Sequence, residues 1–112
     1  VRYYPLLTGD PKVKAEELFY EASELFKKDN LQAAEECLKT AIELDPTYAD
    51  AYESLGVMLG RMERYAEAIE WMKQLSAVDP KSVLAHTNMS LYLMKLGKIE
   101  EAEEQKSQAT IK

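Results

Sequence analysis

The feature that most constrains this chain is a constant interval at which the same kinds of residue return. The interval is the one from Pro46 to Pro80, and each proline follows an aliphatic residue and an aspartate. The same interval connects three leucines, three cations and three alanines: Leu25, Leu59 and Leu93; Lys27, Arg61 and Lys95; Ala34, Ala68 and Ala102. A period of this length is typical of stacked helical repeats, in which each copy packs mainly on its neighbours.

Each copy of the repeat divides into two helices. In the second copy, apolar residues at helical spacing run from Tyr52 to Leu59 and again from Tyr65 to Leu75. An Asp-Pro pair ends the copy, because proline cannot continue a helix. No stretch alternates with a period of two, so no strand is expected. Turns are expected between the two halves of each copy, at Asp29-Asn30, around Glu63 and at Gly97.

We therefore predict an all-α solenoid of three helix–turn–helix repeats. The repeats span about 15–48, 49–82 and 83–112, inside a single domain from 13 to 112 that follows an N-terminal arm or linker at 1–12. One register holds only small residues, which indicates where two helices cross closely, because a bulky side chain would hold the helix axes apart. These residues are Ala22, Gly56 and Ser90.

Composition favours a compact, soluble protein. Apolar residues make up 46% of the chain, charged residues 30%, and the formal net charge is −6. Such a charge repels nucleic acids and anionic membranes, so neither is expected as a partner. No apolar run approaches the ~20 residues of a membrane span, and the single Cys37 implies no oxidising compartment. We expect a cytoplasmic protein. Its start at Val1-Arg2 leads us to expect either a piece of a longer chain or a processed product.

The residue pattern resembles the tetratricopeptide repeat (TPR) family over nearly the whole chain. The family's order is an aromatic residue, Leu-Gly, a large apolar residue, alanine and proline. The second copy matches it with Tyr52, Leu55-Gly56, Leu59, Ala68 and Pro80. The other two copies match in part, at the following residues: Leu18, Ala22, Leu25, Ala34, Leu38, Ala41 and Pro46 in the first copy, and Met89, Ser90, Leu93, Gly97, Ala102 and Ala109 in the third. The departures from the family pattern are Glu21, Glu63, Leu75, His86 and Lys106.

The resemblance implies three tandem repeats in a right-handed superhelix, whose first helices line a concave groove. It also implies a non-enzymatic module that binds a peptide or helix of a protein partner there, without a cofactor or metal. The groove positions implied by the family are Phe19, Tyr20, Ser23, Lys27, Glu53, Ser54, Val57, Arg61, Leu84, Thr87, Asn88, Leu91 and Lys95. The cations among them lie near helix C-terminal ends, and acidic Glu16 and Asp50 lie near N-terminal ends, a distribution that helix dipoles alone favour. The alternative is a groove that recognises charges on its ligand.

One TPR subfamily binds the carboxylate tails of chaperones through a clamp of Lys, Asn and Arg side chains. Without such side chains, a terminal carboxylate loses its charge-assisted hydrogen bonds. This chain does not carry the required residues, so the resemblance does not extend to that ligand. The corresponding positions are Phe19, Ser23, Ser54, Leu84 and Asn88.

The main alternative is a structural or homo-oligomerisation scaffold that packs through its N-terminal arm or its convex face. The arm is apolar at Tyr3, Tyr4, Leu6 and Leu7, and it is interpreted as a linker, a packing arm or a segment that docks in a groove. It leads into Asp10-Pro11, which is expected to cap the first helix.

Trp71 is the convex-face candidate. It is interpreted either as a packing residue or as an anchor for a partner, with Tyr65 and Met72 extending the patch. His86 and Cys37 are interpreted as packing residues, because no second histidine and no paired cysteine provide the spacing of a metal site.

Overall fold

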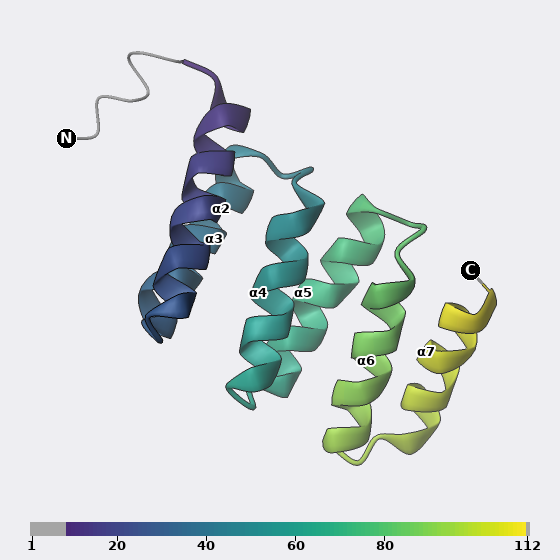
Figure 1. The fold of residues 1–112 in the computed structure, drawn as a ribbon. Coiled ribbons are helices and arrows are strands. Elements are labelled where there is room, and N and C mark those ends of the chain that lie inside the picture. Colours follow the sequence, from purple (N-terminus) through teal and green to yellow (C-terminus); the bar gives the residue numbers. More distant parts are fainter. Residues whose placement is uncertain (1–8, 112) are drawn as a thin grey trace. The chain divides into compact units, whose positions relative to one another are not determined.

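The computed structural model of the protein describes residues 9–111, which contain six helices and no strand. Consecutive helices run antiparallel within each hairpin (Figure 1). The helices are α2 (Pro11–Lys27), α3 (Leu31–Leu44), α4 (Ala49–Arg61), α5 (Tyr65–Val78), α6 (Val83–Lys95) and α7 (Ile99–Ile111). The prediction of an all-α chain is confirmed. Tyr3, Tyr4, Leu6 and Leu7 of the predicted arm lie outside the described residues, and the docking of that arm stays a prediction.

The chain forms two compact units, divided between Ala51 and Tyr52. In the first unit, α2 and α3 pack against each other as a helical hairpin. In the second unit, α6 packs against both α5 and α7. The grouping of 13–112 into one domain of three repeats stays a prediction of the sequence.

The Asp-Pro pairs shape the helix ends through the aspartate side chain as well as the proline ring. Asp45 Oδ1 accepts hydrogen bonds from the backbone N–H (3.1 Å) and the hydroxyl (2.7 Å) of Thr47. Asp79 Oδ1 accepts one from Lys81 N (3.3 Å), so the same turn recurs one repeat later. Asp10 Oδ1 accepts from Lys12 N (3.0 Å), with Pro11 in the first turn of α2, which confirms the predicted cap. The aspartate therefore holds the backbone in the turn that the proline requires.

The turn inside each hairpin uses a left-handed residue at the same repeat position. The residues are Asp29 (φ 62°), Glu63 (φ 62°) and Gly97 (φ 80°), which are separated by the same interval as the two prolines. The three predicted turns are confirmed. A left-handed backbone costs a residue with a Cβ roughly 1–2 kcal/mol, whereas glycine adopts it freely. The turn at Glu63, where the TPR pattern has glycine, is therefore a strained member of the set.

The alanine register that recurs in the three copies lies in the core. Ala34, Ala68 and Ala102 are 0%, 0% and 1% exposed, as expected for positions where helices pack closely. Between α6 and α7, the hydroxyl of Ser90 donates a hydrogen bond to the carbonyl of Ala102 (2.9 Å). This contact needs two small side chains, because a larger pair would separate the helices.

Candidate interaction surfaces

The helix α6 carries an apolar stripe on its solvent side, which we call the outer face of α6 (Leu84, Thr87, Leu91 and Met94). Leu84 is 37% exposed, Leu91 50% and Met94 48%. The opposite side is buried through Ala85, His86, Met89, Tyr92 and Leu93. Exposed large apolar side chains in one row are typical of a surface that binds another protein.

The candidate positions on α4 are less exposed than those on α6. Glu53, Ser54 and Val57 are half-buried, and Arg61 is exposed. The two helices approach closely at Gly60, where an added Cβ would come within 2.5 Å of the Tyr92 ring. The absence of a side chain at Gly60 therefore allows α4 to approach α6.

Asn88 is the candidate residue with an unsatisfied polar atom. Its side chain is half-buried on α6, and Nδ2 is buried without a hydrogen-bond partner among residues 9–111. Leaving a buried donor unpaired costs roughly 1–3 kcal/mol. An acceptor oxygen from a ligand would remove that cost.

The candidate positions on α2 belong to the first unit. The Phe19 ring packs against Tyr48 (ring centroids 5.3 Å apart), and Tyr20 is 68% exposed. Ser23 donates its hydroxyl to the carbonyl of Phe19 (3.2 Å), and Lys27 pairs with Glu24 (3.3 Å). Both polar groups are thus already engaged within their own helix.

The pKa of Tyr48 is sensitive to the negative charges of the first unit. Burial raises the pKa of its hydroxyl above the usual value, and the nearby negative charges of Asp50, Glu16 and Asp45 raise it further. Glu16 and Asp50 therefore act on the same ring, in the region where the sequence places acidic residues at helix N-terminal ends.

Trp71 packs within the second unit. Its ring lies 6.0 Å from that of Tyr52, tilted by 51°, and its side chain is half-buried. The extension of a convex patch through Met72 is wrong, because Met72 is 0% exposed and fills the space left by Gly56. Tyr65 is half-buried and its ring packs against that of Tyr92 (centroids 5.9 Å apart), and its part in such a patch stays a prediction. The role of Trp71 as an anchor stays a prediction.

His86 joins three helices through its two ring nitrogens. Nδ1 lies 2.7 Å from Oε1 of Gln105 on α7, and Nε2 lies 3.4 Å from the hydroxyl oxygen of Ser76 on α5. The side chain is 9% exposed, as expected for a packing residue. Among residues 9–111, no cluster of histidine, cysteine and acidic residues has the arrangement of a metal site.

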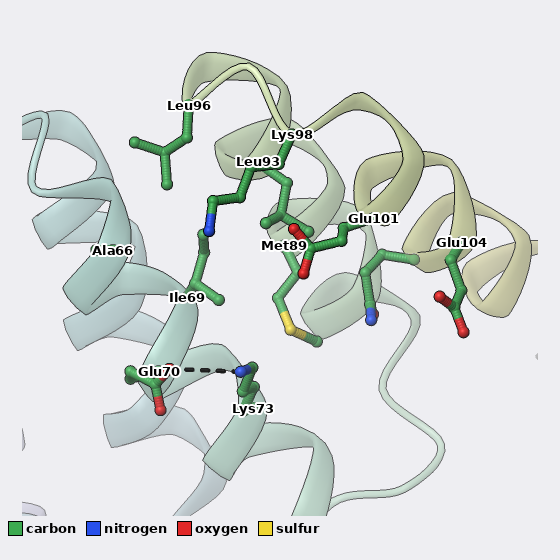
Figure 2. Close-up of a pocket in the computed structure, with 11 residues that line it drawn as sticks. Ala66, Ile69, Glu70, Lys73, Met89, Leu93, Leu96, Lys98, Glu101 and Glu104 are labelled. Atoms are coloured by element: carbon green, nitrogen blue, oxygen red, sulfur yellow. Dashed lines mark hydrogen bonds and ion pairs between the residues drawn. The ribbon is translucent and has the colours of Figure 1, made fainter.

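Sequence reasoning missed a pocket between α5, α6 and α7, which we call the α5–α7 pocket (Figure 2). It encloses about 300 Å³, and no predicted groove residue lines it. Its floor residues, such as Ile69 and Leu93, have the helical spacing of core positions. Its acidic rim resembles a solvated helix surface. Only the packing of three helices shows that they surround one space.

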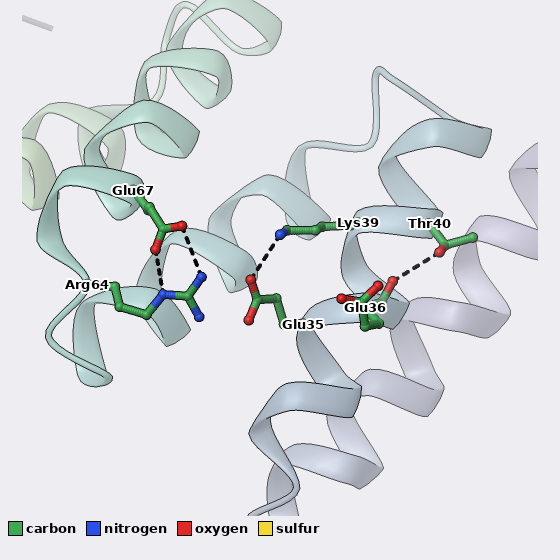
Figure 3. A network of polar contacts seen from close by, with 6 residues as sticks. All are labelled: Glu35, Glu36, Lys39, Thr40, Arg64 and Glu67. Atoms are coloured by element: carbon green, nitrogen blue, oxygen red, sulfur yellow. Dashed lines mark hydrogen bonds and ion pairs between the residues drawn. The ribbon is translucent and has the colours of Figure 1, made fainter.

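The polar contacts drawn in Figure 3 stabilise individual helices. Glu35, which is 5% exposed, pairs with Lys39 one turn later (3.0 Å) on α3. At the start of α5, Arg64 and Glu67 form two parallel hydrogen bonds, one of them 3.0 Å long. Such pairs at i, i+3 and i, i+4 spacing contribute a few tenths of a kcal/mol each. No helix among the described residues combines the length and apolar character needed to cross a membrane.

Two family models match the chain. A TPR repeat model covers residues 22–62, and a tetratricopeptide repeat model covers residues 49–78. This chain is a tetratricopeptide repeat protein. The TPR pattern of the sequence and its all-α helical-repeat solenoid class are therefore confirmed.

Solved structures superpose closely on the chain. Two crystal structures of MamA match 90% and 89% of it at 31% identity, with TM-scores of 0.84 and 0.83, and the matches cover 58% and 54% of the MamA chains. The first TPR of Spaghetti (RPAP3), bound to the HSP90 peptide SRMEEVD, matches 88% of this chain and 78% of its own at 19% identity, with a TM-score of 0.81. The second TPR of Spaghetti, with the same peptide, gives a TM-score of 0.81 at 21% identity, over 89% of this chain and 93% of its own.

A curated relative contains a segment that is similar to part of this chain. The protein O-mannosyl-transferase F38B6.6 of Caenorhabditis elegans is 36% identical over 63 residues, which are 56% of this chain and 9% of the transferase. This TPR chain therefore corresponds to a small part of that protein and to little more than half of MamA.

Proposed function

We propose that this TPR chain is a non-enzymatic interaction module that binds an apolar peptide or helix of a protein partner along the outer face of α6 and the neighbouring positions of α4. The observation that carries the proposal is the row of exposed Leu84, Leu91 and Met94 beside the unpaired Nδ2 of Asn88. Apolar side chains of the ligand would cover the row. The Asn88 amide would turn toward the ligand, and a backbone carbonyl of the ligand would accept its hydrogen bond.

The kind of ligand follows from the charges on these positions. The chaperone clamp needs cations, whereas Ser54, Leu84 and Asn88 provide none at the corresponding positions of the second unit. We propose an internal segment of a partner, held by apolar contact and one amide, and not a terminal carboxylate. The net charge of −6 favours a protein over a nucleic acid. The α2 positions Phe19, Tyr20, Ser23 and Lys27 stay predicted contacts.

Fluorescence anisotropy with labelled peptides tests this proposal. An amidated leucine-rich peptide should bind saturably, and a copy with a free terminal carboxylate should bind no more tightly. Leu91→Ala should weaken binding about tenfold, the effect of about 1.4 kcal/mol of lost apolar contact. Leu96→Ala is the matched control, because Leu96 is similarly exposed (42%) but lies outside the outer face.

Asn88→Ala tests the polar half of the proposal. Removal of the amide should weaken peptide binding while raising the stability of the free chain, because the unpaired donor disappears. Unchanged affinity in both Leu91→Ala and Asn88→Ala would contradict the proposal. A mass that rises with concentration, without peptide binding, would support the oligomerisation scaffold in its place.

A further inference from the structure

The α5–α7 pocket has an apolar floor that is separate from the outer face of α6. Ile69, Met89 and Leu93 are 6%, 3% and 8% exposed at its base, and Leu96 is 42% exposed at its rim. In Figure 2, side chains of α5, α6 and α7 surround the space from three sides. A volume of about 300 Å³ is at the lower end of the range for small-molecule sites, and it suits inserted side chains of a partner.

The rim of the pocket carries unneutralised negative charge. On α5, Glu70 pairs with Lys73 (3.4 Å), so these two charges cancel. On α7, Glu101 and Glu104 lie one turn apart, and neither forms an ion pair or hydrogen bond within residues 9–111. Lys98 is the remaining cation of the lining and has no ion-pair partner in that range either. The lining therefore has one more negative than positive charge, concentrated on α7.

We propose that the α5–α7 pocket is a second docking site, which receives a lysine or arginine side chain and its aliphatic neighbours from a basic amphipathic segment of a protein partner. The apolar floor suits the methylene stem of such a side chain, and the α7 carboxylates suit its cationic head. Anionic ligands are disfavoured by the same carboxylates. A second copy of this chain is disfavoured because it also carries a net charge of −6.

A pair of synthetic peptides with one apolar pattern separates charge recognition from apolar contact. One peptide carries lysine and arginine at its polar positions, and the other carries glutamate. The basic peptide should bind the intact chain at least fivefold more tightly at low salt, and the difference should shrink at high salt because ions screen exposed charges. Equal binding of the two peptides would overturn the proposal.

Charge-neutral variants of equal size locate the site. Glu101→Gln and Glu104→Gln together should weaken binding of the basic peptide about fivefold, the effect of one partly exposed ion pair. The matched control is Glu100→Gln with Glu103→Gln, which removes the same charge from α7 at positions that do not line the pocket. An equal loss in both double variants would overturn the proposal, because it would show a non-specific attraction to the acidic helix.

Apolar variants distinguish this site from the outer face of α6. Leu96→Ala should weaken binding of the basic peptide and leave binding of the leucine-rich peptide unchanged. Leu91→Ala should weaken binding of the leucine-rich peptide and leave binding of the basic peptide unchanged. In NMR spectra, the amide signals of Leu96 and Glu101 should shift when the basic peptide binds. The amide signals of Leu84 and Leu91 should shift when the leucine-rich peptide binds. Basic-peptide shifts that fall on the outer face of α6, or a dimer abolished by Glu101→Gln with Glu104→Gln, would overturn the proposal. If the intact chain binds the basic peptide but not the leucine-rich peptide, only the proposed function is contradicted.

Discussion

The helix α6 has one buried face and one exposed face, and residues of the two faces lie close together in the sequence. Met89 and Leu91 are two positions apart, yet Met89 is 3% exposed and Leu91 50%. On the buried face, α6 packs against α5 and α7, and Tyr92 fills the space above Gly60 of α4. The exposed face is almost as apolar but has no covering element among the described residues. One helix therefore contributes to stability through one face and to a candidate binding surface through the other. The hydrophobicity of the residues does not tell the two faces apart.

The largest expected effect comes from truncating the buried face. Met89→Ala should lower the free energy of unfolding by about 2–3 kcal/mol, because it removes buried contacts and leaves a cavity that enlarges the α5–α7 pocket. Leu91→Ala should change it by less than about 0.5 kcal/mol, since Leu91 is half exposed. Urea denaturation followed by circular dichroism measures both. Equal losses would show that the outer face of α6 is covered in solution.

The contact of α4 with α6 should be nearly as sensitive. In Gly60→Ala, the new Cβ would lie 2.5 Å from the Tyr92 ring, which has no flexible end to move aside. The variant should lose about 1–2 kcal/mol, because the displacement outweighs the gain in helix propensity. Gly56→Ala is the control, since its Cβ meets the flexible end of Met72. A smaller loss at Gly60 than at Gly56 would contradict this account of the crossing.

The turn after α6 isolates backbone strain from packing. A Cβ at Gly97 would contact nothing within 4 Å, so Gly97→Ala should cost about 1 kcal/mol through its positive φ alone. Glu63→Gly makes the opposite change at the equivalent turn and should stabilise the chain by up to about 1 kcal/mol. Thermal unfolding of the two variants compares them. Destabilisation by Glu63→Gly would mean that its side chain contributes more than its backbone costs.

The smallest effect concerns alkaline pH. Burial raises the pKa of the Tyr92 hydroxyl, the neighbouring Tyr65 raises it further, and Arg61 partly opposes the shift. The unfolded chain ionises near the ordinary value of about 10, so the contribution of neutral Tyr92 is intact below that pH and is lost as pH rises through the raised pKa. Tyr92→Phe should therefore lose less stability than the natural chain above pH ~10. If both chains lose the same stability as pH rises, the folded structure does not raise the pKa of Tyr92.

Much of the fold was predictable because the helix signals are local. The Asp-Pro pairs predicted the helix ends, and the residues at Asp29-Asn30, Glu63 and Gly97 predicted the three turns. The structure confirms both predictions. Met72 shows the limit of this reasoning. A methionine on the second helix was interpreted as part of a convex patch, yet it is fully buried because Gly56 on the neighbouring helix leaves room for it. The depth of burial depends on the partner helix, which local periodicity does not specify.

The α5–α7 pocket shows the same limit for binding surfaces. Ile69, Leu93 and Glu101 come from three helices, and each has an ordinary local explanation as a core or surface residue. The groove positions followed from the family pattern, but their exposure did not. The outer face of α6 is open, whereas Glu53, Ser54 and Val57 of α4 are half-buried.

The amino-acid sequence by itself determined the helices, their caps and turns and the identity of the repeat, because these depend on residues close together in the chain. Only the tertiary structure decided which apolar side chains become core and which stay exposed, and where carboxylates and apolar groups of different helices share a pocket. The physical reason is that burial and cavities arise from the distance between packed helices. A single missing Cβ, as at Gly60, sets how closely two helices approach.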